Sequence, residues 1–304
     1  EPINDVILSW KARTTLYKYH WWPMKECKHN SYYNNLYANN GGLCKYDQLF
    51  LTNSVKYQKE NYFRSSESGD GDNNWAGFCD KAAILSCLYK YPVNDVIVEY
   101  NNKIITFTPH DIEALMILST NNTIKNNIKL FFGERNNVIN EINDKNKQKS
   151  KDEPFPSDLL HMLQIFCKSN EPFIMDYDSG HAVWNFSYDG VTVYKTSICG
   201  INHDLNLKGK TEYYDFKITS SVYPDNNMDI WGYVNNENIE DNNGYHNKKK
   251  EGWISNNHPD FIWKVYSTDS VWKGKSKINP EIDAETVYNI YIHSIRNRNQ
   301  KLVI

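Results

Sequence analysis

One cysteine of this 304-residue chain has the surroundings of a nucleophile. Cys79 follows Gly77 and opens an apolar run, Ala82 to Leu85, that has the spacing of a helix. A cysteine at the start of a helix lies beside free backbone N–H groups and the positive end of the helix dipole, which favour the thiolate over the thiol. The thiolate is the form that attacks a carbonyl carbon. The alternative interpretation is a small buried cysteine that happens to begin a helix.

A nucleophilic cysteine needs a base that takes its proton and a third group that orients the base. His161 lies within an apolar run, and Asp176 ends the next one. If both runs were adjacent antiparallel strands, the two side chains would come together and the carboxylate would keep the imidazole basic. The run around His161 leaves helix or strand open, because Ser157 ahead of it is a suitable helix cap. His181, which opens a predicted strand, is the rival base.

The chain offers other histidines that we interpret as ordinary. Six of them lie in polar loops or close to predicted helix ends, where solvated surface residues are expected: His20, His29, His110, His203, His246 and His293. The helix predicted over residues 111–118 is apolar enough to be core packing, so we assign it no catalytic role.

Composition excludes several classes of function. The net charge of -3 gives no global field for nucleic acid, and no apolar run approaches the roughly 20 residues that span a bilayer. Six cysteines are too few for a disulfide scaffold, although Cys27 and Cys44 could be bridged in an oxidising compartment. No pair of Cys or His has zinc-site spacing, and the acidic loop at residues 65–74 lacks the EF-hand pattern. We therefore expect no metal, no cofactor and no nucleic-acid partner, and we expect a secreted monomer.

Turn and capping signals mark most of the predicted elements. Strands at 96–100 and 103–107 are joined by an Asn-Asn turn, and the helix after them has Thr108 as its cap, Pro109 in its first turn and Asp111 for a capping box. Further along, strands are predicted at 171–176, 183–186, 191–194, 212–219 and 230–234, polar loops at 136–153 and 235–250, and a helix at 283–295. Asp189-Gly190 predicts a hairpin turn between the strands on either side of it.

These elements predict an α+β fold in which the cysteine-bearing helix packs on an antiparallel β-sheet. Hydrophobic residues make up 40% of the chain, enough for a large core. We expect residues 1–70 to be a loop-rich N-terminal region packed on the core. Residues 71–304 would then form the catalytic domain.

One segment carries a family resemblance. Val183 to Tyr194 reads VWNFSYDGVTVY and closely resembles the surface segment VWNQPVxGxxVY of the oomycete-type transglutaminase elicitor family, with Phe-Ser in place of Gln-Pro. Three other stretches are similar to the same family in the same order: Trp75–Cys79 with Ala82 and Ala83, Asp111–Leu115, and His258–Trp263 with Asn279 and Pro280. The resemblance covers residue 70 to the C-terminus. The chain departs from the pattern after the cysteine, where Asp80-Lys81 replaces the usual Trp-Ala.

The resemblance implies a papain/transglutaminase-like fold and acyl transfer by a Cys-His-Asp triad. Carried over residue by residue, Cys79 is the nucleophile, His161 the base and Asp176 the carboxylate, with Asp178 as a fallback. The family's histidine lies in a strand, so the resemblance favours strand over helix around His161.

The implied activity is that of a protein-glutamine gamma-glutamyltransferase. Cys79 would form a thioester with a glutamine side chain of a protein substrate, and a lysine or small amine would resolve it with His161 as base. Trp75 and Trp184 are candidate walls of a dry substrate channel. If water could enter the channel, it would hydrolyse the thioester in place of the amine, and the site would deamidate glutamine. A papain-like cysteine protease and a secreted recognition protein without activity are the alternatives.

Overall fold

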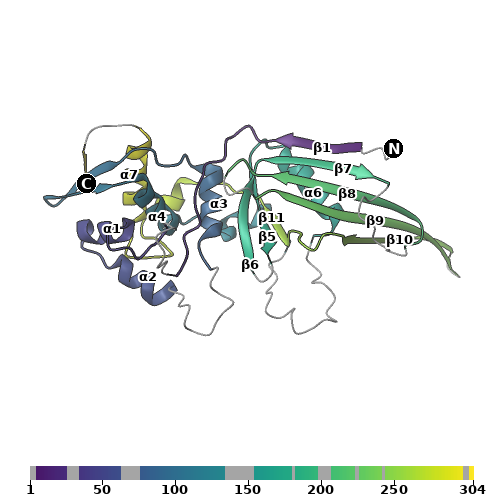
Figure 1. Cartoon of the computed structure of the whole chain (residues 1–304), viewed down its shortest axis with the longest axis horizontal. Helices are drawn as coiled ribbons and strands as arrows, with labels where there is room; N and C mark the ends of the chain where they lie inside the picture. The colour runs from purple at the N-terminus through teal and green to yellow at the C-terminus, as the bar shows by residue number, and fades with distance from the viewer. Residues whose placement is uncertain are drawn as a thin grey trace. The chain divides into compact units, whose positions relative to one another are not determined.

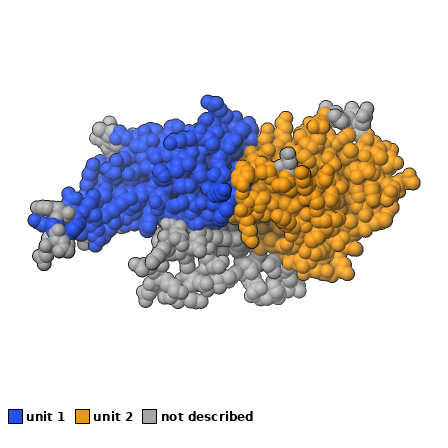
Figure 2. All heavy atoms as spheres, turned by 180° about the vertical axis from the view of Figure 1, so that it is seen from behind, with its two compact units in different colours: residues 1–16, 127–265 blue, residues 17–126, 266–304 orange. Residues whose placement is uncertain are grey.

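The computed structural model describes residues 5–25, 34–62, 76–133, 154–179, 182–197, 207–222, 226–241, 244–296 and 301–304 (Figure 1). The chain divides into two compact units, each made of two separate segments (Figure 2). Unit 1 comprises residues 1–16 and 127–265, and unit 2 comprises residues 17–126 and 266–304. Helices and antiparallel sheets together make the fold α+β, as predicted. The domain boundary near residue 70 stays a prediction.

The described part of unit 1 contains two sheets and the helix α6. The five-stranded antiparallel sheet has the order β1 (Asp5–Lys11), β7 (Gly190–Thr196), β8 (Lys210–Thr219), β9 (Met228–Asp241) and β10 (Gly244–Trp253). The four-stranded sheet has the order β4 (Phe131–Gly133), β11 (Phe261–Trp263), β5 (Phe173–Ser179) and β6 (Ala182–Tyr188). Helix α6 (Pro156–Cys167) packs against β1, β9 and β10, and its buried side chains join one core with residues of both sheets.

Asp189-Gly190 does not form the hairpin that we predicted. β6 pairs with β5 in the four-stranded sheet, whereas β7 pairs with β1 and β8 in the five-stranded sheet. Both residues are buried, and a Cβ at Gly190 would clash with Oγ1 of Thr219 on β8. The turn therefore carries the chain from one sheet to the other. In Figure 1, β6 runs in a different direction from β7 and β8.

The polar loop predicted at residues 235–250 is also wrong. These residues form the distal half of β9 and most of β10, which pair from Gly232 with Trp253 out to Asp241 with Gly244. Their side chains are largely polar, so the hydrophobic alternation that marks a half-buried strand is missing. Backbone pairing, rather than side-chain burial, defines this part of the sheet.

Unit 2 is mainly helical. Its helices are α1 (Gly42–Phe50), α2 (Ser54–Tyr62), α3 (Cys79–Leu88), α4 (Pro109–Ser119), η2 (Asp269–Trp272) and α7 (Ala284–Ile295), and its small sheet has the order β12 (Leu302–Val303), β2 (Val96–Tyr100) and β3 (Lys103–Phe107). A 3-10 helix, η1 (Ile124–Leu130), follows α4 in the chain. β1, α1 and α2 lie in the described parts of the N-terminal 70 residues. Leu43, Tyr46 and Leu49 of α1 contribute fully buried side chains to the core of this unit.

The local signals around α4 are confirmed. Thr108 caps the helix, its side chain accepts from the Asp111 backbone N–H, and the Asp111 carboxylate accepts from the Thr108 N–H in return. Asn101 and Asn102 take positive φ angles of 48° and 63°, as the tight turn between β2 and β3 requires. Within the described part of the chain, no helix combines the length and apolarity needed to cross a membrane.

Candidate functional site

Cys79 is the first residue of α3, as its neighbours in the sequence predict. Its side chain is half-buried, and the capping position is held by Phe78, whose side chain makes no capping hydrogen bond. The thiol therefore stands at a helix N-terminus whose N-cap residue, Phe78, makes no side-chain hydrogen bond to the first turn. This is the environment that favours a thiolate.

A short antiparallel bridge fixes the chain directly before Cys79. Pro23 pairs with Gly77, the Phe78 N–H donates to the Trp22 carbonyl at 3.1 Å, and the Met24 N–H donates to the Ala76 carbonyl at 3.0 Å. Only glycine fits at position 77 without rearrangement, because a Cβ there would clash with Cε3 of the Trp21 ring. The glycine before the nucleophile thus allows an indole to pack directly on the backbone.

Helix α3 is buried along most of its length and packs against α4. Lys81, which departs from the family pattern, is buried and donates from Nζ to the Asn122 carbonyl at 2.5 Å. Burial lowers the pKa of Lys81, and the nearby Asp80 carboxylate partly offsets this. The lysine therefore anchors the first turn of α3 to the segment that follows α4.

The strand predicted around His161 is wrong. Residues 156–167 form helix α6, which begins with Pro156 and a capping interaction from Asp158. Leu159 and Leu163 face the core, and His161, halfway between them, is exposed. The helix forms because the apolar positions follow the period of a helix, and this periodicity places His161 on the outer side.

Asp176 is a fully buried carboxylate in the middle of β5. It pairs in register with Asn185 of β6, and its Oδ1 accepts the backbone N–H of Phe261 on β11 at 2.9 Å. The preceding residue, Met175, lies in the core that α6 covers, so Asp176 points to the opposite face of the sheet. Unit 1 therefore does not bring the His161 and Asp176 side chains together.

Sequence reasoning overlooked His258. Its side chain is buried, and its ring stacks on Trp253 with centroids 5.3 Å apart and planes 10° from parallel. It lies three residues before Phe261, whose backbone binds Asp176, and three residues span at most about 11 Å. Among the described histidines of unit 1, His161 and His246 are exposed and His258 is buried. The Pro-Asp-Phe-Ile-Trp run after it was the available signal, because it carries the family resemblance.

The remaining predicted site residues are placed as follows. Trp184 is half-buried, stacks on Phe186 and pairs with Tyr177, so it lies on the face of the sheet opposite to Asp176. Asp178 lies in β5. Trp75 and His181 lie outside the described residues, as do Cys27, the acidic loop at 65–74 and the polar loop at 136–153.

The described residues include two cysteines, Cys44 and Cys167, that we do not consider catalytic, and they contain no metal-binding cluster. Cys44 carries a thiol that donates to the Asn39 carbonyl, so it is not bridged in the way that the sequence allows. Burial raises the pKa of the Cys167 thiol in α6 to about 12, which makes it an inert core residue. No group of three or more His, Cys, Asp or Glu in the described ranges is arranged to hold a metal ion.

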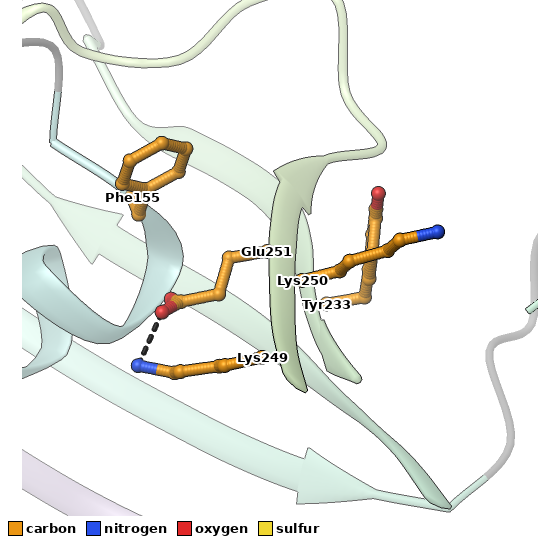
Figure 3. Close-up of a pocket in the computed structure, with 5 residues that line it drawn as sticks. All are labelled: Phe155, Tyr233, Lys249, Lys250 and Glu251. Carbon is orange, nitrogen blue, oxygen red and sulfur yellow. Dashed lines mark ion pairs between the residues drawn. The ribbon is translucent and has the colours of Figure 1, made fainter. Parts of the chain in front are cut away.

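A pocket of about 380 Å³ opens at the edge of the five-stranded sheet, lined by Phe155, Tyr233, Lys249, Lys250 and Glu251 (Figure 3). Glu251 and Lys249 point toward α6 and form an ion pair. Glu251 also accepts the Ser157 N–H at 3.0 Å, and Lys249 donates to the Ser157 hydroxyl at 2.9 Å. These two side chains provide hydrogen-bond partners for the backbone N–H and the hydroxyl of Ser157 at the start of α6. None of the predicted site residues lines this pocket.

A carboxylate pair on the other face of the five-stranded sheet gives a pH-dependent prediction. Burial and a hydrogen bond with Asp229 raise the pKa of Asp215 to about 6, while Lys217 lies 3.4 Å from Asp215 and 2.8 Å from Asp229. The folded state thus holds this proton more tightly than the unfolded state, and stability falls as pH rises from about 4 through about 6. Asp215→Asn should stabilise the protein by about 1 kcal/mol more at pH 8 than at pH 5. Denaturant unfolding at both pH values measures this, and equal gains at both would contradict it.

Comparison with known proteins identifies the family. The model of the transglutaminase elicitor family matches residues 45–231, more than half of the chain. The matched region includes Cys79, His161 and Asp176, and His258 lies beyond it. No curated protein and no solved structure matched the chain. The family match, together with a half-buried cysteine at a helix start, shows that this chain belongs to the transglutaminase elicitor family.

Proposed function

We propose that this protein is a glutamine-specific acyltransferase of the transglutaminase type. The observation that carries the proposal is the position of Cys79, the first residue of α3, in a chain that belongs to the transglutaminase elicitor family. A thiolate at a helix N-terminus is activated before substrate arrives. The papain/transglutaminase-like fold is part of the proposal, supported by the cysteine-bearing helix and the antiparallel sheets.

The reaction proceeds in two half-reactions. The Cys79 sulfur attacks the side-chain carboxamide carbon of a glutamine, the carbon–nitrogen bond breaks, and the nitrogen leaves as ammonia after taking the thiol proton through the base. The resulting thioester is attacked by the amino group of a lysine or a small amine, which restores the thiol and forms an isopeptide bond. The backbone N–H of Cys79 is the first donor to the oxyanion.

We assign the role of base to His258 and the role of orienting carboxylate to Asp176. A base works best where its tautomer and orientation are fixed. The stacking of His258 on Trp253 fixes the plane of its ring, and the segment that carries it is tied to Asp176 through Phe261. His161 is exposed on the outer side of α6, with no such restraint on its ring among the described contacts. His181 stays a rival candidate, as the sequence predicted.

The proposal is tested by amine incorporation. The purified protein is incubated with a glutamine-rich protein and a labelled primary amine, and the covalently bound label and the released ammonia are both measured. Equal amounts of the two support transamidation, and ammonia without bound label means deamidation. Cleavage of the substrate without either product supports the papain-like protease, and no product at all favours a recognition protein without activity. We propose that the protein acts as a secreted monomer on such substrates.

A further inference from the structure

A buried carboxylate of α4 joins titratable side chains from separate parts of unit 2. Glu113 is fully buried. Its Oε1 accepts the backbone N–H of His20 at 2.6 Å and lies 3.1 Å from Nδ1 of the same residue. Its Oε2 accepts the Tyr91 hydroxyl at 3.0 Å and lies 3.5 Å from Nδ1 of His110. The sequence alone predicts only solvated histidines and an inert core helix here.

The environment keeps Glu113 ionised. Burial raises the pKa of this carboxyl, but the hydrogen bonds from His110 and His20 outweigh burial and hold the pKa below its usual value. Among the described residues, the Tyr91 and Tyr19 hydroxyls are also close to this carboxylate, and burial together with the Glu113 charge raises the pKa of both phenols. A buried anion with these partners is stabilised most strongly when the imidazoles carry a proton.

This cluster is connected to the start of α3 through residues 20–24. His20 is held by Glu113, and two residues later the Trp22 carbonyl accepts the N–H of Phe78, the residue that precedes Cys79. The Trp22 ring also packs on the His110 ring, with centroids 4.6 Å apart. The position of the helix start therefore depends on a segment that the Glu113 carboxylate anchors at His20, and whose Trp21 and Met24 carbonyls also accept hydrogen bonds from Asn34 and Tyr37.

We propose that Glu113, together with His20 and His110, is a positioning residue that sets the reactivity of Cys79 through residues 20–24. The inference rests on the proposed function, in which Cys79 is the nucleophile. Loss of the carboxylate charge releases His20 and His110, residues 20–24 shift, and the first turn of α3 loses its fixed position. The charge state of the cluster thus enters the pH dependence of the thiol.

The chain offers a matched control on the same helix. Asp111 is buried two residues before Glu113 and is paired with Lys45 at 2.5 Å, so it also carries a buried charge in an ion pair. Its partners are Lys45 of α1 and the cap residue Thr108, not residues 20–24. Asp111→Asn therefore removes a buried carboxylate charge from the same helix without touching the segment that leads to Cys79.

The experiment measures alkylation of Cys79 by iodoacetamide between pH 5 and 9, with the Cys79 peptide quantified by mass spectrometry. Glu113→Gln should slow alkylation at neutral pH roughly tenfold and change the shape of the pH profile. Asp111→Asn should keep the wild-type profile. A Glu113→Gln profile that coincides with the wild type, or an equal change in Asp111→Asn, overturns the inference and leaves the proposed function standing. A wild-type Cys79 that reacts no faster than Cys44 overturns both.

Discussion

Replacement of Cys79 by alanine should reduce incorporation of a labelled primary amine by at least about 10⁴-fold. The thioester cannot form without the sulfur, and no other described cysteine begins a helix. Cys79→Ser tests the same point with a side chain of similar shape, because a serine hydroxyl at this position is a far weaker nucleophile than a thiolate. The measurement is the rate of label bound to a glutamine-rich protein under excess amine.

Cys87 provides the control for this prediction, since it lies in the same helix and is also half-buried. Cys87→Ala should retain amine incorporation within about twofold of the wild type. Residual activity of Cys79→Ala near the wild-type level would end the assignment of the nucleophile. Loss of activity in both variants, with intact folding, would mean that the assay does not single out Cys79 as the nucleophile.

The second large effect is expected at His258. Removal of a general base that acts together with a nucleophile should lower the rate by about a thousandfold or more. His258→Ala should show this loss, whereas His161→Ala should stay within a few-fold of the wild type because its side chain is exposed on α6. The same assay on His181→Ala completes the comparison, and a loss there alone would transfer the role of base to His181.

His258 is buried against Trp253, so its removal also affects packing. Added imidazole separates the two effects, because a small base can enter the space that His258→Ala leaves and restore proton transfer but not stability. Partial recovery of the rate with imidazole is the expected result. A thousandfold loss in His161→Ala, with the helix intact by circular dichroism, would restore the base that the sequence predicted.

The elements that the sequence predicts well are those decided by nearby residues. Thr108, Pro109 and Asp111 determine the start of α4 within one turn, and two Asn residues suffice for the turn between β2 and β3. A signal of the same kind exists for α7, where the Asp283 side chain accepts the Thr286 N–H at 2.8 Å. Such interactions depend on no partner elsewhere in the chain.

The errors have two sources: a local pattern that fits two structures, and pairing between distant strands. The run around His161 fits either a short strand or a helix, and the family resemblance favoured the wrong one; the helical period of Leu159 and Leu163 was the better guide. Asp189-Gly190 has the local sequence of a hairpin turn, but β7 finds its partners in β1 and β8. The pairing of β1 depends on residues far away in the chain, which no local pattern reports.

The candidate site divides in the same way. Cys79 could be recognised from its neighbours, because a glycine before it and an apolar helix after it are local features. The hydrogen bonds of Glu113 could not, since they depend on His20 and Tyr91 from other parts of the chain. For His258 the family resemblance of the run after it was available, but no local pattern predicts that its ring stacks on Trp253.

The pairing of β1 with β7 also affects how the protein is made. β1 leaves the ribosome about 180 residues before β7, and at roughly 5–20 residues per second it waits roughly 10 to 40 seconds for its partner. In unit 2, β2 likewise waits for β12, about 200 residues later. Neither unit can therefore finish folding while only its first segment has been synthesised. Both stay incompletely folded until late in translation, which lengthens the time during which chaperones can bind the nascent chain.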